Sequence, residues 1–175
     1  MNKANTSNKS GEEVKLRDFR LEDLSQIKRL VYETIDVDYS YYPAEFISDW
    51  KIRFHSENRI LRDALDGYTL VAEIDESFAG TGTLHGEEIS RVYVKRNFQK
   101  RGIGKQIMDQ LEERAKEKGI NIIYLTSTTD SKPFYEARGY KTFEVEILSK
   151  DEIREVGYYK MKKQITSKVR KTKVL

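Results

Sequence analysis

The stretch VYVKRNFQKRGIGKQIM, residues 92–108, joins an apolar strand to an amphipathic helix through a basic turn that contains Gly102 and Gly104. The strand is predicted at 88–95, the helix from about Ile103 to Lys118, and a second, central strand at 121–128. A helix that connects two strands in this way is a crossover, which makes the two strands parallel. This unit therefore demands a sheet with at least one parallel pair and a helix packed on one of its faces.

The rest of the chain adds strands that follow one another by short turns, which is typical of antiparallel pairing. The further strands are predicted at 14–20, 68–74, 77–85, 141–148 and 155–163. The further helices are predicted at 21–35, 43–54 and 57–65, with a short one in DSKPFYEARGY that Asp130 would cap and Pro133 would tolerate in its first turn. Residues 36–43, DVDYSYYP, are predicted to be a loop.

Apolar side chains recur at helical spacing in the two longest helices. They are Leu24, Ile27, Leu30 and Val31 in the first, and Ile103, Ile107, Met108, Leu111 and Ala115 in the crossover helix. The fold class is therefore α/β of the α+β type, with a mixed, mainly antiparallel sheet of six to seven strands flanked by helices.

The 175 residues fit one domain, which we place at 13–165. Residues 1–12 are predicted to be a disordered leader, and 166–175 a basic C-terminal tail. No apolar run approaches the roughly 20 residues that cross a bilayer, and no secretory signal is evident, so no membrane contact and a cytoplasmic location are expected. The net charge of +3 is small, and the basic tail lacks interleaved aromatic residues, so a nucleic-acid partner is not favoured.

The chain contains no cysteine and only two histidines, His55 and His85. Disulfides, thiolate metal sites and a cysteine nucleophile are therefore excluded. The two histidines have no paired spacing, so no metal centre is expected.

The basic turn has the properties of a phosphate site. Five cations and no acid lie between positions 95 and 105, and the glycines let a helix N-terminus approach an anion closely. The turn fits neither the P-loop, because RGIGKQ lacks the first glycine and the hydroxyl, nor the dinucleotide fingerprint, because Ile107 replaces the last glycine. An ordinary surface turn is the alternative that the glycine pair alone leaves open.

Taken with its surroundings, the turn resembles the acetyl-CoA signature of the GNAT superfamily of N-acetyltransferases, Q/R-x-x-G-x-G/A after a strand. Gln99, Gly102 and Gly104 fall on this pattern together with Arg101. KPFYEARGY is similar to the later family segment F-Y-x-x-x-G-F, with a tyrosine at the final position, and YYPAEFISDW resembles the Y-P…W segment of many members. The likeness covers about Val14 to Leu148.

The resemblance implies that the turn binds the pyrophosphate of coenzyme A and that strand 88–95 splays from strand 121–128 to admit the pantetheine arm. One backbone N–H near Val94 would face the thioester oxygen. The cofactor-binding residues it implies are Val92, Tyr93, Val94, Gln99, Lys100, Arg101, Gly102, Ile103, Gly104, Lys105 and Phe134.

Two catalytic residues are also implied. Tyr135 matches the usual proton donor to the leaving thiolate, and otherwise packs as a core aromatic residue. Glu88 stands where some members carry a glutamate that acts as the base. It is predicted to share a strand face with Ser90, Val92 and Val94, where apolar neighbours would raise its pKa toward neutrality. The alternatives are a solvated charge at a strand end, His85 or Glu87 as the base, or a relayed water.

On the acceptor side, Tyr41 and Tyr42 are the candidate substrate-binding residues, whereas Phe46 and Trp50 are expected in the core. Many members carry an asparagine before the F-Y pair; here Thr128, Thr129 or Ser131 would have to replace it.

The predicted function is direct transfer of an acetyl group from acetyl-CoA to a primary amine in a small molecule or peptide, without a metal and with dimers common for such folds. The alternative is a coenzyme A sensor or regulatory protein without turnover.

Overall fold

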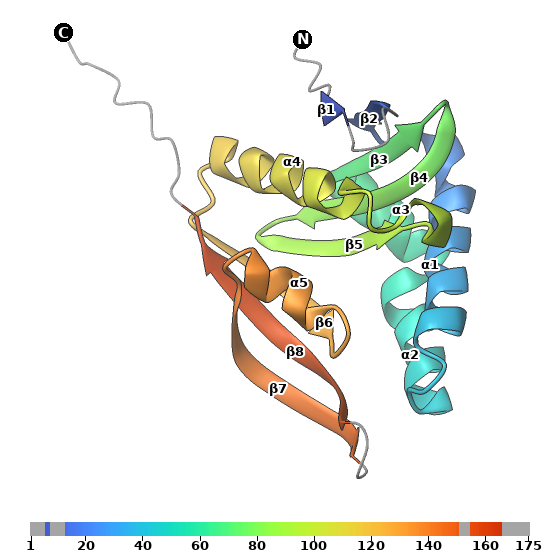
Figure 1. Ribbon diagram of the computed structural model, residues 1–175, viewed down its shortest axis with the longest axis vertical. Helices are drawn as coiled ribbons and strands as arrows, with labels where there is room; N and C mark the ends of the chain where they lie inside the picture. Colours follow the sequence, from blue (N-terminus) through green and yellow to red (C-terminus); the bar gives the residue numbers. More distant parts are fainter. Residues whose placement is uncertain (1–5, 8–12, 151–154, 166–175) are drawn as a thin grey trace, which may run out of the picture.

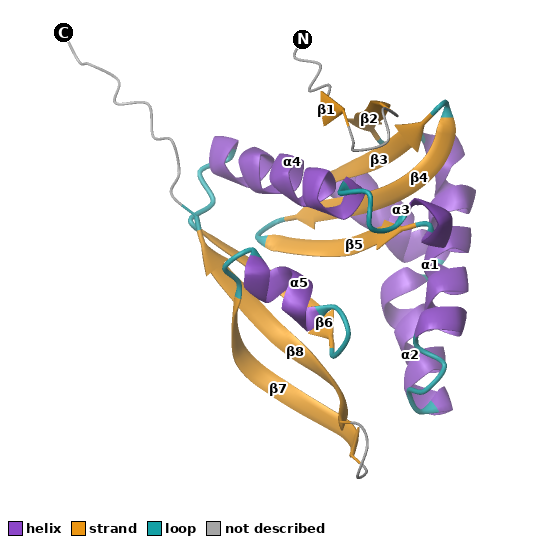
Figure 2. Ribbon diagram, viewed as in Figure 1, coloured by secondary structure: helices purple, strands orange, loops and turns teal. Residues whose placement is uncertain are grey.

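One mixed sheet lies between two layers of helices (Figures 1 and 2) in the computed structural model, which describes residues 6–7, 13–150 and 155–165. The strands are β1 (Thr6–Ser7), β2 (Glu13–Asp18), β3 (Tyr68–Ile74), β4 (Ser77–His85), β5 (Glu88–Val94), β6 (Ile122–Thr128), β7 (Lys141–Lys150) and β8 (Glu155–Gln164). The helices are α1 (Leu24–Asp38), α2 (Ala44–His55), α3 (Glu57–Asp66), α4 (Ile103–Glu117) and α5 (Lys132–Ala137), with short 3₁₀ turns at Leu21–Asp23 and Arg96–Phe98.

The strand order in the described residues is β1-β2-β3-β4-β5-β6-β8-β7. All neighbours pair antiparallel except β5 and β6, which are the parallel pair that the crossover helix α4 demands. The predicted fold class is thus confirmed, with β1 as a two-residue addition at the edge. The expected leader at 1–12 lies outside the described residues except for β1, at 6–7. The basic tail at 166–175 lies outside them as well.

Each face of the sheet carries its own apolar core. The predicted inner face of α4 is buried against one side, together with Tyr135 of α5. The predicted inner face of α1 is buried against the other side, where Ile27, Leu30 and Val31 meet Ile60 of α3, and Leu24 is half-buried. Helical periodicity therefore identified both packing faces correctly.

β5 and β6 separate almost as soon as they meet. Their register contains one pair, Glu88 opposite Tyr124, next to a hydrogen bond from the Tyr124 N–H to the Glu87 carbonyl oxygen at 2.9 Å. β5 stays paired with β4 as far as Val94, while β6 pairs with β8 along its whole length. Figure 1 shows the two strands diverging towards α1 and α2, which confirms the predicted splay.

Local predictions were wrong at several places. α1 continues to Asp38, into the predicted loop, because residues 36–38 contain neither glycine nor proline, and it ends with Tyr39 as its C-cap. Ser131, not Asp130, precedes α5, since the Asp130 carboxylate accepts a hydrogen bond from the Tyr41 hydroxyl instead. β2 ends at Asp18, and a 3₁₀ turn precedes α1. None of the helices formed by the described residues is long and apolar enough to span a bilayer.

Candidate active site

The basic turn enters α4 through a left-handed backbone. Gly102 precedes the helix with φ of 80°, and Lys100 has φ of 61°. The first helical bond runs from the Gln106 N–H to the Gly102 carbonyl oxygen at 3.0 Å, so the N–H groups of 103–105 have no partner within the helix. N–H donors at the positive end of a helix dipole are groups that can bind an anion.

The cations of the turn are held loosely or lie over aromatic rings. Lys105 pairs with Asp109 at 2.8 Å on the exposed surface, and the Arg101 guanidinium lies 5.5 Å from the centre of the Phe98 ring. Lys100 is exposed. Exposed ion pairs contribute little to stability, so these charges can turn towards an incoming anion at small cost.

Three of the predicted cofactor-binding residues meet at the N-terminal end of α4. A β-carbon added to Gly104 would lie 3.7 Å from Phe134 Cζ and 3.8 Å from Val94 Cγ2. Gln99 lies beside them, because its side-chain amide donates to the Val94 carbonyl oxygen at 3.1 Å. Gly104, Val94 and Phe134 come from three separate elements, and the fold brings them together at the C-terminal end of β5, where this strand no longer pairs with β6.

A β-bulge changes which side chains of β5 share a face. Tyr93 pairs with Thr81 and Ser90 with Thr83, so two residues of β5, Arg91 and Val92, oppose one of β4. Arg91 adopts φ of 52° at this point.

The bulge restarts the alternation of side chains along β5. Ile89, Val92 and Val94 all contact the core under α4, while Tyr93 faces the core under α1. The prediction that Glu88 shares a face with Val92 and Val94 is therefore wrong: Glu88 lies on the opposite side from Ile89 and is exposed.

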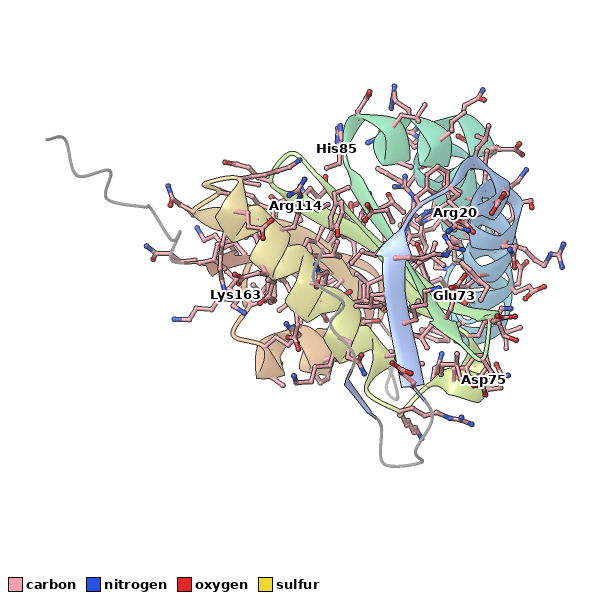
Figure 3. All side chains as sticks on the ribbon, turned by 90° about the horizontal axis from the view of Figure 1, so that it is seen from above. Arg20, Glu73, Asp75, His85, Arg114 and Lys163 are labelled. Carbon is pink, nitrogen blue, oxygen red and sulfur yellow. The ribbon has the colours of Figure 1, made fainter. Side chains whose placement is uncertain are left out.

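The other two candidates for the base also lie at the β4–β5 turn. Glu87 is exposed, and His85 is half-buried at the end of β4. In Figure 3, viewed from above, His85 lies at the rim of the molecule beside the end of α3. The structure therefore does not bring His85, Glu87 or Glu88 together with the residues around Gly104.

Tyr135 lies in the core between α5 and the sheet and is 8% exposed. Its ring packs edge-on against Phe134 at 5.1 Å and against Tyr140 at 5.9 Å, measured between centroids. Burial raises the pKa of its hydroxyl well above the ordinary phenol value, and the nearby Tyr39 hydroxyl adds to this shift. The group is therefore protonated at neutral pH.

The loop between α1 and α2 contacts the loop between β6 and α5 across the splayed strands. Tyr42 is 4% exposed, and its hydroxyl donates to the Gly157 carbonyl oxygen at 2.8 Å and accepts from the Thr129 N–H at 3.2 Å. Tyr41 is half-buried. Of the two candidate substrate-binding residues, Tyr42 is therefore held as a structural brace, whereas Tyr41 lies nearer the surface.

The predicted replacements for the family asparagine take part in the same contact. Thr128 Oγ1 donates to Ser131 Oγ at 3.0 Å, and Ser131 Oγ lies 3.4 Å from the Tyr39 hydroxyl. The Thr129 N–H donates to the Tyr42 hydroxyl. These hydroxyls join the acceptor-side loop to the start of α5.

Aromatic rings line the acceptor side between α1, α2 and β8. Phe46 and Trp50, which were expected in the core, are only half-buried. Trp50 packs on the α1 core, while Phe46 stacks between Tyr42 and Tyr158, with centroids 5.5 and 5.9 Å away. The faces of aromatic rings bind cationic amines, and in this group those of Phe46 are taken up by Tyr42 and Tyr158.

Sequence reasoning missed His55, which is 5% exposed at the end of α2. Its ring lies 5.7 Å from Trp50 and 5.9 Å from Tyr93, and neither nitrogen has a hydrogen-bond partner among the described residues. Burial and the charge of Arg91 lower its pKa to about 3, although Asp63 acts in the opposite direction. An isolated histidine in a polar helix carries no sequence signal for such burial.

The side chains described here form no group of three or more His, Cys, Asp or Glu residues that could hold a metal ion.

Comparison with known families and structures finds one consistent relationship. Residues 37–164 match the family model described as "Acetyltransferase (GNAT) domain". The chain is 28% identical over 95 residues to an "Uncharacterized N-acetyltransferase in pepI 3'region" of Lactobacillus delbrueckii subsp. lactis, a match that covers 53% of this chain and 54% of the relative. Matches to the curated relatives span about half of their length, 44% to 54%.

Two solved structures illustrate the likeness of fold. A GCN5-related N-acetyltransferase from Rhodopseudomonas palustris superposes with a TM-score of 0.74 at 19% identity, over 94% of this chain and 100% of that one. The PaiA N-acetyltransferase of Thermoplasma acidophilum, solved in complex with coenzyme A, superposes with a TM-score of 0.68 at 21% identity, over 87% and 99%.

Proposed function

Because this chain belongs to the family of GNAT acetyltransferases, we propose that it transfers the acetyl group of acetyl-CoA to a primary amine by direct attack in a ternary complex. The observation that carries the proposal is the meeting of Gly104, Val94 and Phe134 at the C-terminal end of β5, beyond its single pair with β6. This arrangement brings together three parts that acetyl-CoA would use. They are the basic turn for its phosphates, the unpaired edge of β5 for its pantetheine arm, and α5, which carries Tyr135, for its sulfur.

The turn fits the pyrophosphate of coenzyme A. The left-handed Gly102 aims the free N–H groups of 103–105 outward, and Lys100, Arg101 and Lys105 supply positive charge around them. The proposal gains further support from PaiA, a neighbour of the same fold that was solved with coenzyme A.

The unpaired edge of β5 fits the amide-rich pantetheine arm. A peptide-like chain adds to a strand edge through backbone hydrogen bonds, and Val92, Tyr93 and Val94 have no strand opposite them on the β6 side within the described residues. Gln99 Nε2 already occupies the Val94 carbonyl oxygen, so this side chain would have to move or share that acceptor. A backbone N–H near Val94 would stabilise the negative charge that develops on the carbonyl oxygen.

Acetyl-CoA would supply an activated acetyl thioester. In the overall reaction the amine nitrogen bonds to the acetyl carbon, the carbon–sulfur bond breaks, the nitrogen loses a proton and the sulfur gains one. Tyr135 would hold the proton for the sulfur on its hydroxyl. Its raised pKa keeps that proton in place at neutral pH but makes the hydroxyl a weaker acid than a free phenol, so the transfer depends on close positioning.

Glu88 is the proposed base, with a water as intermediary. The bulge places its side chain on the same side of β5 as Tyr93, which faces α1 and the acceptor loop. Its exposed carboxylate would order a water that takes up the amine proton. Because the chain has no cysteine, no acetyl-cysteine intermediate is available, and direct transfer is the expected course.

The acceptor is proposed to be a cationic amine on a small molecule or peptide. It would enter from the side of α1 and α2, where Tyr39 and Trp50 present their rings. Tyr41 lies at the surface of this region, beside the exposed Asp130.

Calorimetry with acetyl-CoA at low ionic strength, followed by an amine panel, tests the proposal. Release of coenzyme A can be read with a thiol reagent, since the cysteine-free protein gives no background. Saturable binding together with thiol release for at least one amine supports the acetyltransferase. Binding of acetyl-CoA without release of coenzyme A for any amine would favour a coenzyme A sensor. No binding of acetyl-CoA would refute both functions.

A further inference from the structure

Arg91 has the wrong backbone conformation for its place in a strand. Its φ of 52° lies in the left-handed region, which side-chain-bearing residues rarely adopt. It stands at the β-bulge that sends Val92 and Val94 to one face and Tyr93 to the other. A conformation of this kind persists only where the surrounding structure holds it.

The surrounding structure holds Arg91 through contacts to its side chain. One guanidinium nitrogen, Nη2, donates to Asp63 Oδ2 of α3 at 2.6 Å and to the carbonyl oxygen of Phe54, in the last turn of α2, at 2.7 Å. The side chains of Arg91 and Asp63 are 3% and 4% exposed. Arg59 also donates to Asp63 Oδ2, at 2.8 Å. We name Arg91, Asp63 and the Phe54 carbonyl the bulge clamp.

A contribution to the stability of the fold does not by itself account for the bulge clamp. Asp63 Oδ1 and Arg91 Nε have no hydrogen-bond partner among the described residues, and the adjacent His55 ring has none either. Buried ion pairs with such gaps can often be replaced by apolar side chains without loss of stability. The stability of the fold therefore does not explain why the charges are there.

The position of the bulge clamp does suggest a reason. It ties the helices on the acceptor side, α2 and α3, to β5 immediately before Val92–Val94, the segment that has no pairing with β6 among the described residues. Tyr93, the second residue after Arg91, packs edge-on against His55. The clamp thus links both proposed substrate sites through one residue.

We propose that Arg91 and Asp63 are positioning residues that hold the β5 bulge, and with it the backbone of Val92–Val94, in the geometry that receives the thioester. The inference rests on the proposed function, because the ligand it serves is acetyl-CoA. Without the clamp, Arg91 relaxes to an ordinary strand conformation, and the backbone groups of 92–94 turn away from the ligand.

The test compares three variants with the wild type. Arg91→Met removes the guanidinium, and Arg91→Met/Asp63→Leu replaces the whole pair with apolar side chains. Arg17→Met is the matched control, because Arg17 forms a comparable pair with the buried Asp23, at 2.7 and 2.8 Å, between β2 and the following 3₁₀ turn. The readouts are the unfolding midpoint, the Kd of coenzyme A, kcat, and hydrogen exchange of residues 89–95.

We expect the double variant to unfold within a few degrees of the wild type, yet to lose about 10- to 100-fold in kcat and in coenzyme A affinity, and to exchange faster at 89–95. Arg17→Met should show the opposite pattern, a lower midpoint with kcat and Kd unchanged. The inference fails if the double variant keeps wild-type Kd and kcat, or if Arg17→Met loses as much of both as Arg91→Met does.

The two proposals can fail separately. If the wild type binds no coenzyme A, the proposed function is lost, and the clamp is then judged by hydrogen exchange alone: equal exchange at 89–95 in the wild type and the double variant refutes it. If the wild type binds coenzyme A and the variants bind equally well, only the clamp is refuted.

Discussion

The Tyr42 hydroxyl donates a hydrogen bond to the carbonyl oxygen of Gly157 at 2.8 Å, which joins the α1–α2 loop to β8 over a sequence separation of 115 residues. The same hydroxyl accepts from the Thr129 N–H, so one buried oxygen satisfies two backbone groups.

Tyr42→Phe should therefore destabilise the protein by about 1–3 kcal/mol, because the Thr129 N–H loses this acceptor and the Gly157 carbonyl oxygen keeps only the longer bond from the Thr129 hydroxyl, at 3.4 Å. Tyr41→Phe is the control, since Tyr41 is half-buried and its hydroxyl binds an exposed carboxylate. Chemical denaturation measures both. Equal losses would mean that the hydroxyl of Tyr42 is not a brace.

Gly102→Ala should weaken coenzyme A binding, because a side chain disfavours the left-handed backbone that opens α4. Gly119→Ala is a matched control at the other end of α4: its φ is 75°, and nothing lies within 4 Å of an added β-carbon. Both substitutions should cost about 1–2 kcal/mol in stability. Only Gly102→Ala should raise the Kd of coenzyme A in calorimetry. A similar rise in Gly119→Ala would mean that the weaker binding does not come from the turn at Gly102.

His55 makes stability sensitive to acid. The pKa of its imidazole is about 3 in the folded protein and 6.5 when exposed, so between these values only the unfolded chain binds the proton. Stability is fully present above pH 6.5 and falls as the pH drops below it, by up to about 1.4 kcal/mol per pH unit from this group.

Denaturation curves between pH 7.5 and about pH 5 check this expectation. His55→Phe should flatten the dependence of stability on pH, whatever it does to the absolute stability. A wild-type slope that survives in His55→Phe would assign the acid sensitivity to other groups.

Tyr135→Phe should lower kcat by about 10²-fold while leaving the Kd of coenzyme A nearly unchanged, because the substitution removes only the proton that the sulfur needs. Tyr140→Phe removes a neighbouring buried hydroxyl, which donates to Glu112 at 3.2 Å, and should lower stability instead of kcat. An unaltered kcat in Tyr135→Phe would leave Tyr135 with a packing role alone.

The crossover unit and the packing faces of α1 and α4 could be predicted because their signals are local and repeated. Five apolar residues at helical spacing leave one way for α4 to bury them. The basic turn before α4 could be predicted for the same reason, since its glycines and cations stand next to each other in the chain; its binding of an anion stays a prediction.

The face of Glu88 could not be predicted, because a regular strand alternates its side chains and nothing in EISRVYV marks the extra residue of a bulge. What holds Arg91 there is Asp63, 28 residues away. The burial of His55 depends likewise on Trp50 and Tyr93, which meet only after the sheet has formed. The conformation of Arg91 and the burial of His55 depend on contacts between residues that are far apart in the sequence. Short-range sequence patterns do not reveal such contacts.

The parting of β5 from β6 after one paired position leaves two strand edges inside the sheet. An edge without a partner is a template on which a strand from another molecule can assemble. A ligand that fills this space would therefore protect the protein from aggregation as well as from heat, and the empty form should be the one that precipitates first.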